Sequence, residues 1–212
     1  MKNPWEEISL DDYENHMRLD SVMQLQAINE LMKGQLAAFP ACSVMILGVA
    51  GGNGLEHIRR ERFEKVYGVD INSGYLEAVR RRYPELNGLL ECLQTDLTRE
   101  AESLPHAGLV IANLLVEYIG YDCFQRVLRQ VGPGYVSCVI QINTGEGWVS
   151  DSPYLHAFDG LEQVHHQMEP QALERALLQI RYRLDRTLEH PLPNGKSLIQ
   201  MDFTRAGESA WN

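Results

Sequence analysis

The sequence predicts an α/β fold, a doubly wound and mostly parallel seven-stranded sheet that ends in an antiparallel hairpin. Short apolar segments alternate with helical segments over residues 43–142, which is typical of a parallel sheet with helices on both faces. A glycine-rich turn follows the first apolar segment. Near the end of the chain, two strand-like segments flank Asn194-Gly195, a strong hairpin turn signal. We expect the 212 residues to form one domain.

The expected elements follow one another in a regular order. In residues 19–36 apolar side chains recur at near-helical spacing, and Pro40 ends this helix, so residues 1–40 form a helical leader. The core, residues 41–142, comes next, then an irregular segment at 143–168, and then a helix and hairpin within 169–212. Strands are expected at 43–48, 65–70, 89–94, 108–113, 134–142, 182–190 and 197–204, and further helices at 55–62, 73–83, 121–130 and 169–180.

The glycine turn and the acid after the second strand form a nucleotide-binding pattern. The first strand ends at Gly48, Gly52 and Gly54 follow it, and the second strand ends in Asp70. Glycine adopts positive φ and lets a ligand lie against bare backbone. The helix expected from Leu55 would offer unpaired N–H groups, and an acid about 20 residues on can accept hydrogen bonds from both ribose hydroxyls. These features predict a site for an adenosine-containing cofactor.

The glycine spacing alone leaves the identity of the cofactor open. Gly48-x-x-x-Gly52-x-Gly54 is similar to the nucleotide loop of short-chain dehydrogenases, but no tyrosine in the sequence has a lysine four residues later, as their catalytic pair requires. The stricter G-x-G-x-x-G pattern also fails, because no glycine stands three residues after Gly54. An NAD(P)-dependent oxidoreductase of Rossmann type and a non-catalytic cofactor-binding protein therefore stay as alternatives.

The ordered motifs resemble those of class I S-adenosylmethionine-dependent methyltransferases of the small-molecule kind (type 11/12-like). LGVAGGNGLEHI resembles their first motif, YGVDIN their second, LQTDL the end of their third strand, and LVIANLLVEYI their fourth strand and the loop after it. The resemblance covers roughly residues 43–204. It implies a Rossmann-like fold, S-adenosyl-L-methionine as methyl donor and S-adenosyl-L-homocysteine as product. The sequence departs from the family at Ile46, where an acid is often found, and at Ala50, where glycine is usual.

The resemblance also implies which residues bind the cofactor. Asp70 would bind the ribose and Asp96 the adenine amino group, although each carboxylate could instead cap the helix that follows it. The loop after the fourth strand would face the methyl donor. The cofactor residues expected from the resemblance are Gly48, Ala50, Gly52, Gly54, Asp70, Ile71, Asp96, Leu97, Asn113 and Leu114.

Two segments outside these motifs are expected to enclose the methyl acceptor. Residues 143–168 are irregular and contain several aromatic residues and histidines, Trp148 among them, and long connections of this kind are often functional lids. In the resembling family the insertion after the fifth strand covers the acceptor, and residues 5–17 could cover it from the other side. Tyr13, Tyr118 and His156 are the candidate catalytic residues, because each can donate or accept a hydrogen bond next to an acceptor.

Charge and composition narrow the possible partners. The chain has 29 acidic and 19 basic side chains, a net charge of −10, and its arginine clusters fall on expected outer helices. Nucleic-acid binders neutralise phosphates with clustered basic residues, so a small-molecule acceptor is expected rather than DNA or RNA. His165 and His166 are adjacent and lack a carboxylate or cysteine at ligand spacing, so no metal is expected.

The sequence also indicates where the protein works. No apolar run approaches the roughly 20 residues that span a bilayer. The first 17 residues are acidic and amphipathic, unlike a signal peptide. We therefore expect a cytoplasmic protein without membrane association. The sequence makes no prediction of the oligomeric state or of which acceptor atom is methylated.

Overall fold

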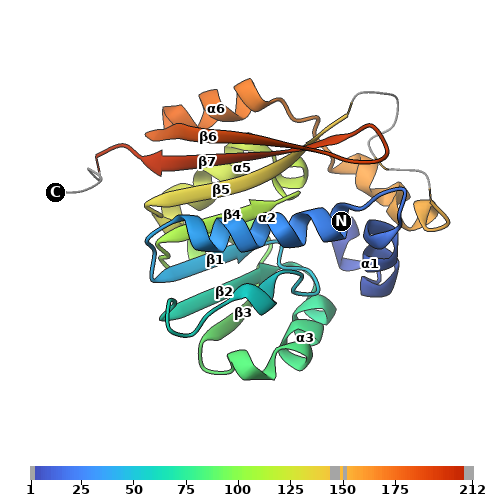
Figure 1. The fold of residues 1–212 in the computed structure, drawn as a ribbon, viewed down its shortest axis with the longest axis horizontal. Coiled ribbons are helices and arrows are strands. Elements are labelled where there is room, and N and C mark those ends of the chain that lie inside the picture. Colours follow the sequence, from blue (N-terminus) through green and yellow to red (C-terminus); the bar gives the residue numbers. More distant parts are fainter. Residues whose placement is uncertain (1–2, 144–148, 150–151, 208–212) are drawn as a thin grey trace.

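A seven-stranded sheet runs through the molecule, with the strand order β3-β2-β1-β4-β5-β7-β6 (Figure 1). The computed structural model describes residues 3–143, 149 and 152–207. Strands β1 to β5 are parallel where they pair, and β7 pairs antiparallel with both β5 and β6. The predicted fold class is therefore confirmed. The strands are β1 (Ser43–Leu47), β2 (Lys65–Asp70), β3 (Leu90–Gln94), β4 (Leu109–Asn113), β5 (Tyr135–Ile142), β6 (Tyr182–Pro191) and β7 (Ser197–Arg205).

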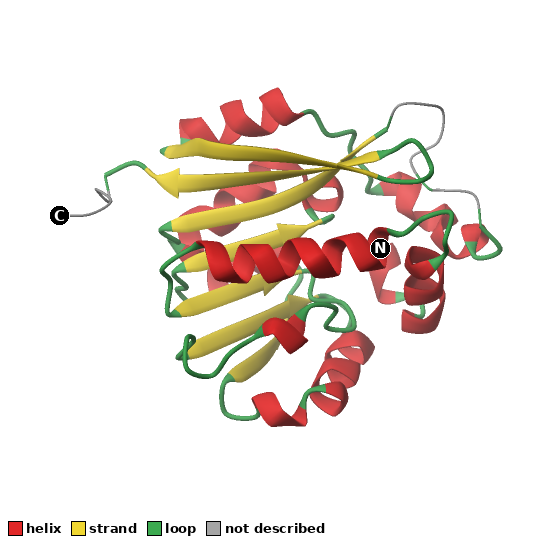
Figure 2. Ribbon diagram, viewed as in Figure 1, coloured by secondary structure: helices red, strands yellow, loops and turns green. Residues whose placement is uncertain are grey.

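Helices cover both faces of the sheet (Figure 2). Helices α2 (Gln24–Ala38) and α3 (Ser73–Arg82) pack on one face. Helices α4 (Leu97–Glu100), α5 (Val116–Val131) and α6 (Pro170–Gln179) pack on the other. The short helix α1 (Leu10–Arg18) lies beyond the end of the sheet, beside the start of α2 (Figure 1).

Strand β1 shows why this sequence makes a two-sided core. Side chains alternate across a strand, so Val44 and Ile46 join the cluster under α2 and α3, whereas Met45 and Leu47 join the cluster under α5. All four are almost fully buried. A continuous apolar run is what a parallel strand covered on both faces requires.

The strand order reverses between β1 and β4, and this fixes where a ligand can bind. β1 is followed in the chain by β2 on one side, and β4 by β5 on the other. The loops that leave β1 and β4 therefore diverge, and a crevice opens at the carboxyl ends of these strands. The glycine turn leaves β1 at this point.

The helix predicted at residues 55–62 is wrong. Only a 3-10 turn, Leu55–His57, follows the glycine turn, and Ile58 is extended. Ile58 and Phe63 are both buried, but residues five apart lie about 140° apart around an α-helix and could not both face the core. Helix α2 of the leader covers this part of the sheet instead. The helix N-terminus expected after the glycine turn is therefore replaced by a single short turn.

Candidate functional site

A cavity lies at the carboxyl ends of strands β1 to β4, where the strand order predicts a ligand site. It encloses about 690 Å³, its open mouth included, and we call it the strand-end cavity. Each of these strands contributes to its wall, and the residues include Gly48 after β1, Asp70 at the end of β2, Asp96 after β3 and Asn113 at the end of β4.

Asp70 is buried and held in place by backbone groups. Its Oδ2 accepts a hydrogen bond from the N–H of Ala50 at 2.9 Å, and its Oδ1 accepts one from the N–H of Asn72 at 2.9 Å. Burial raises the pKa of Asp70 to about 6, although these N–H groups favour the charged form. Asp70 does not cap α3, because the side chain of Asn72 accepts from the N–H groups at the start of that helix. A carboxylate has lone pairs beyond these two bonds, so Asp70 can also accept from a ligand.

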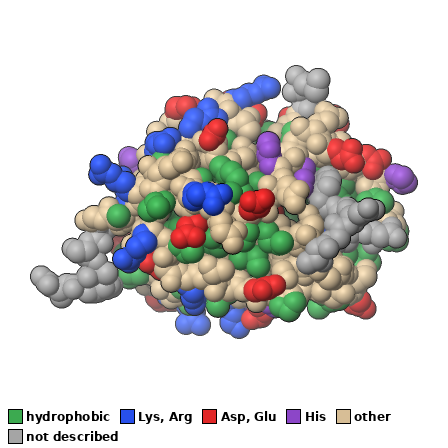
Figure 3. Space-filling view, turned by 90° about the horizontal axis from the view of Figure 1, so that it is seen from above, with side chains coloured by type: hydrophobic (Ala, Val, Ile, Leu, Met, Phe, Trp, Pro, Cys, Tyr) green, Lys and Arg blue, Asp and Glu red, His purple; other side chains and the backbone are tan. Residues whose placement is uncertain are grey.

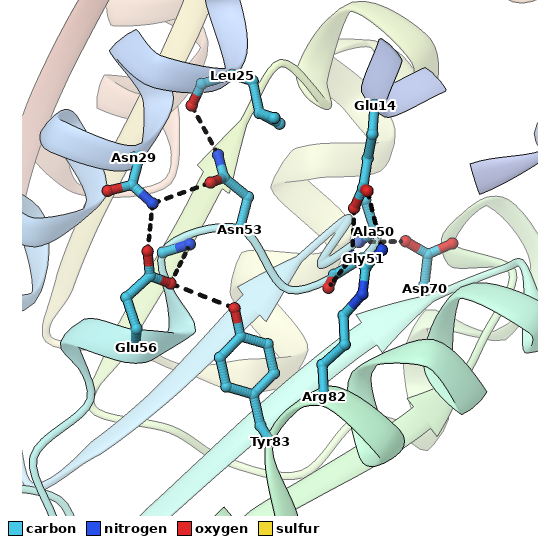
Figure 4. Close-up of polar contacts among 11 residues, drawn as sticks. Glu14, Leu25, Asn29, Ala50, Gly51, Asn53, Glu56, Asp70, Arg82 and Tyr83 are labelled. Carbon is cyan, nitrogen blue, oxygen red and sulfur yellow. Dashed lines mark hydrogen bonds and ion pairs between the residues drawn. The ribbon is translucent and has the colours of Figure 1, made fainter. Parts of the chain in front are cut away.

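Three helices hold the glycine turn in its shape (Figure 4). From α3, Arg82 donates to the carbonyl oxygen of Gly51 at 3.0 Å and forms a two-pronged ion pair with Glu14 of α1, whose second bond is 2.9 Å. From α2, the carbonyl oxygen of Leu25 accepts a hydrogen bond from the side chain of Asn53 at 2.9 Å. Glu14 is 9% exposed, so this carboxylate lies under the surface. The leader helices are therefore fastened to the turn.

Gly52 and Gly54 shape the turn rather than face the strand-end cavity. Neither is among the described residues that line it. Gly52 has φ +89, and a Cβ there would lie 2.6 Å from the ring of Tyr83; Gly54 has φ +92, and a Cβ there would lie 2.7 Å from the sulfur of Met32. Both positions need glycine, because the backbone is left-handed and the neighbours leave no room.

The other residues expected to contact the cofactor do reach the strand-end cavity. Asp96 caps the short helix α4, since its Oδ1 accepts from the N–H and the hydroxyl of Thr98 at 2.9 and 2.6 Å. It also lines the cavity, so the two interpretations of this residue are compatible. That it binds an adenine amino group stays a prediction. The remaining expected residues on the wall are Ala50, Ile71, Leu97 and Leu114.

Tyr75 belongs to this cavity and was not predicted. It is 3% exposed, lines the cavity, and its Oη has no hydrogen-bond partner among the described residues. An unsatisfied buried polar group costs about 1–3 kcal/mol, so this hydroxyl suits a ligand that supplies a partner. The sequence signal was its place in the first turn of the helix that follows Asp70, since that turn faces the same crevice.

A second cavity adjoins the first and is separated from it by aromatic side chains. It encloses about 550 Å³, open mouth included, and we call it the leader cavity. Trp5, Tyr13, Leu114 and Tyr118 line both cavities. The ring of Trp5 meets those of Tyr118 and Tyr13 edge-on, with centroids 4.8 and 5.8 Å apart. A ligand in one cavity thus lies against the same wall as a ligand in the other.

The leader and residues 152–168 close the leader cavity together. His16 of α1 meets the hydroxyl of Ser152 at 2.7 Å, and its ring lies 4.8 Å from that of Phe158. Ile8, Phe158 and Leu161 are buried against one another in a small apolar cluster. Both segments expected beside the acceptor therefore reach one cavity. Trp148 lies outside the described residues.

The structure brings two of the three candidate catalytic residues together. Tyr13 and Tyr118 are on the wall between the cavities, and burial raises the pKa of both phenols, so they stay neutral. His156 is different: its side chain is 93% exposed, it pairs with Asp159 at 3.3 Å, and it is not among the described residues that line either cavity.

Polar residues outside the predicted catalytic set also line the leader cavity, among them Glu117, Gln24 and Gln141. Glu117, in the first turn of α5, is 4% exposed; its Oε1 accepts from the N–H of Gln141 at 3.2 Å. The side chains of Gln24 and Gln141 are hydrogen-bonded to each other. Gln141 lies near the carboxyl end of β5, and Glu117 follows β4. The rule that ligands bind at the carboxyl ends of parallel strands could have indicated both.

Charges and helices elsewhere give no sign of other ligands in the part of the chain described. On the face drawn in Figure 3, acidic side chains are spread across the surface, and basic side chains lie among them on the left and in the centre. Among the described residues, histidine, cysteine and acidic side chains form no cluster that could hold a metal ion. None of the helices in the same residues combines the length and apolar character that a membrane span needs.

The ion pair between Glu14 and Arg82 predicts how firmly the leader is held. Replacing Glu14 by Gln should speed amide hydrogen exchange in residues 10–18 by about fivefold, because solvent screens the partly exposed Arg82 and losing the ion pair then costs about 1 kcal/mol. Hydrogen exchange followed by mass spectrometry measures this. Asp11→Asn is the control, since Asp11 is exposed on the same helix. Equal exchange in both variants would contradict a fastening role for Glu14.

Comparison with solved structures finds this fold in methyltransferases. N-methyltransferase NodS from Bradyrhizobium japonicum WM9, in complex with S-adenosylhomocysteine, matches with a TM-score of 0.67 at 9% identity, over 97% of this chain and 100% of that chain. Magnesium protoporphyrin IX methyltransferase from Synechocystis PCC 6803, also with S-adenosylhomocysteine, gives 0.66 at 12% identity, over 95% and 96%. The [4+2]-cyclase SpnF gives 0.65 at 8% identity, over 89% and 84%.

The TM-scores show that the fold is that of class I S-adenosylmethionine-dependent methyltransferases, and at such low sequence identity they show the fold alone. No protein-family model and no curated protein matches the sequence. Because one of the similar structures is a cyclase, the chemistry of this chain has to be argued from its own site.

Proposed function

We propose that this protein binds S-adenosylmethionine in the strand-end cavity and transfers its methyl group to a small molecule in the leader cavity. One observation carries the proposal: the two cavities share a wall formed by Trp5, Tyr13, Leu114 and Tyr118. A transfer between two bound molecules needs two adjoining sites that hold the reacting atoms close together.

The residues of the strand-end cavity fit the proposed cofactor. Asp70 has lone pairs for ribose hydroxyls, and the unpartnered Oη of Tyr75 can bond to a further polar group. Asp96, whose carboxylate also caps α4, lines the same cavity, and we expect it to accept from an adenine amino group. When bound, the cofactor supplies a methyl group on a positively charged sulfur.

The chain's own contribution is to position the reactants and exclude water. Helix α1 and residues 152–168 cover the leader cavity, and the rings of the shared wall limit the paths open to the acceptor. Such enclosure favours transfer over side reactions with solvent. Tyr13 and Tyr118 can orient an acceptor by hydrogen bonds, because their phenols stay neutral.

The missing family acid at Ile46 is compensated from another part of the chain. A third cavity beneath the glycine turn is lined by Ile46, Ala50 and Glu14. Glu14 reaches the turn through Arg82, which donates to the carbonyl oxygen of Gly51. We infer that this pair does the loop-holding work that an acid at position 46 would do.

The alternatives have less support from the structure. The sheet ends in the antiparallel pair β7 and β6, which dehydrogenase domains of Rossmann type do not usually have. A non-catalytic binding protein would not need the second cavity beside the first.

We also propose that the described segments act as one domain, with the cytoplasm as the site of action, and we expect no nucleic-acid or membrane partner.

Calorimetry tests the proposed function directly. Purified protein should bind S-adenosylhomocysteine and S-adenosylmethionine and should not bind NAD. Adenosine alone should bind more weakly, because it reaches only the end near Asp70 and Asp96. Tight binding of NAD, with no binding of S-adenosylmethionine or S-adenosylhomocysteine, would overturn the proposal.

A further inference from the structure

The leader cavity contains a buried carboxylate, the side chain of Glu117. Glu117 lines the cavity and is 4% exposed, and its Oε2 has no hydrogen-bond partner among the described residues. Its other oxygen, Oε1, accepts a hydrogen bond from the N–H of Gln141 at 3.2 Å. Buried polar groups are nearly always paired, and an exception of this kind indicates a missing partner.

The other groups that face this cavity make it selective for positive charge. His16 and His165 line it, and burial lowers the pKa of both, so they are neutral at physiological pH. Lys196 is close enough to contribute to these two shifts, but it is not among the described lining residues, and burial lowers its own pKa to about 8. Glu117 is therefore the one charged side chain on the wall as the described residues define it.

Aromatic rings complete the cavity around this carboxylate. Trp5, Tyr13, Tyr118 and Phe158 line it together with Glu117. The negative faces of aromatic rings attract a cation, by about 0.5–1 kcal/mol at exposed sites and more when water is excluded. A carboxylate among aromatic rings suits a ligand with a cationic head and an apolar body.

We propose that the methyl acceptor is a small organic amine, which binds with its ammonium group on Oε2 of Glu117 and its apolar part against Trp5, Tyr118 and Phe158. This inference rests on the proposed function and specifies its acceptor. A carboxylate or phosphate acceptor would meet an unfavourable charge here, and an alcohol would gain only one hydrogen bond without charge.

Glu117 can also remove the proton that the ammonium group of such an acceptor must lose before it is methylated. An ammonium nitrogen has no free electron pair, so one N–H proton passes to the Glu117 carboxylate, which becomes a neutral acid. The freed pair forms the new N–C bond to the methyl carbon, and the electrons of the broken C–S bond stay on sulfur. The product is a methylated ammonium ion and a neutral thioether. Burial raises the pKa of Glu117 to about 7, which suits a base that works near neutral pH.

Binding measurements with matched probes test the proposal. A series of scaffolds, each as amine, alcohol and carboxylate (2-phenylethylamine, 2-phenylethanol and phenylacetate are one set), is titrated into protein saturated with S-adenosylhomocysteine. We expect the amines to bind at least tenfold more tightly than the matched alcohols, and the carboxylates to bind most weakly, because a charged hydrogen bond is worth about tenfold to a hundredfold. Glu117→Gln should abolish the amine preference.

The control variant is Glu162→Gln, which removes one exposed carboxylate from the same covering segment. It should keep the amine preference, which separates local recognition from net charge. The proposal is overturned if no scaffold shows an amine preference, or if Glu117→Gln keeps it. Binding of S-adenosylhomocysteine is measured on the same samples: its loss would count against the proposed function, whereas its retention without an amine preference would refute this inference alone.

Discussion

Asp70→Ala should weaken the binding of S-adenosylhomocysteine by about tenfold or more while the protein stays folded. A carboxylate that takes ribose hydroxyls makes charge-assisted hydrogen bonds, each worth about 1.5–3 kcal/mol. In this chain the carboxylate is buried and its orientation is fixed by the N–H groups of Ala50 and Asn72, so it is ready for the ligand before binding. Calorimetry at pH 8, with thermal melting to confirm folding, measures the change.

The pH dependence gives an independent check of the same residue. Because burial raises the pKa of Asp70 to about 6, the wild-type affinity should fall as the pH drops below that value, since protonation removes an acceptor. Asp70→Ala should lose this dependence. Ser73→Ala, which is exposed one turn away, should behave like wild type. Unchanged affinity in a folded Asp70→Ala protein would mean that Asp70 only holds the turn.

Most of the fold could be predicted because its signals are local. Apolar runs such as Val44–Leu47 and the Asn194-Gly195 turn specify strands and a hairpin within a few residues of sequence. The helix expected at residues 55–62 failed because its charges look helical, whereas the burial of Ile58 and Phe63 depends on α2. The packing of α2 against these residues is a tertiary contact between distant parts of the chain, so a short stretch of sequence cannot predict it.

The candidate site also has residues that local sequence predicts and residues that only the tertiary structure brings together. Residues that directly follow parallel strands, such as Asp70 and Asp96, meet at one edge whatever the loops do, so their common wall was predictable. Glu14 and Arg82 meet across 68 residues, and neither position signals the other. Glu117 lies in the first turn of α5, before the non-helical residue Gly120, where φ is +73, and the sequence pattern did not predict this break in the helix.

Glu117→Gln should stabilise the unliganded protein by about 2 kcal/mol at pH 8. Burial raises the pKa of Glu117 from 4.5 to about 7, and each unit of such a shift corresponds to about 1.4 kcal/mol. A carboxyl group with a raised pKa destabilises the folded state when charged, so the penalty is fully present above pH 7 and absent below about pH 4.5. The whole shift corresponds to about 3.5 kcal/mol. An amide of the same shape avoids this charge penalty, but its buried NH₂ group lacks a partner and costs about 1.5 kcal/mol, so a gain of about 2 kcal/mol is left. For a chain of this size the melting temperature should rise by roughly 4–8 °C.

The advantage of Glu117→Gln should therefore shrink as the pH falls from 7 to 4.5. Asp70 titrates in the same range in both proteins, so its contribution cancels in the difference. Glu162→Gln, which removes an exposed carboxylate, should change the melting temperature little at any pH. A pH-independent difference, or a loss of stability at pH 8, would contradict a buried and unpaired charge. A buried charge that lowers the free energy of unfolding of the unliganded protein is consistent with a role in ligand binding. A cationic acceptor would pair with this charge and so remove the loss of stability.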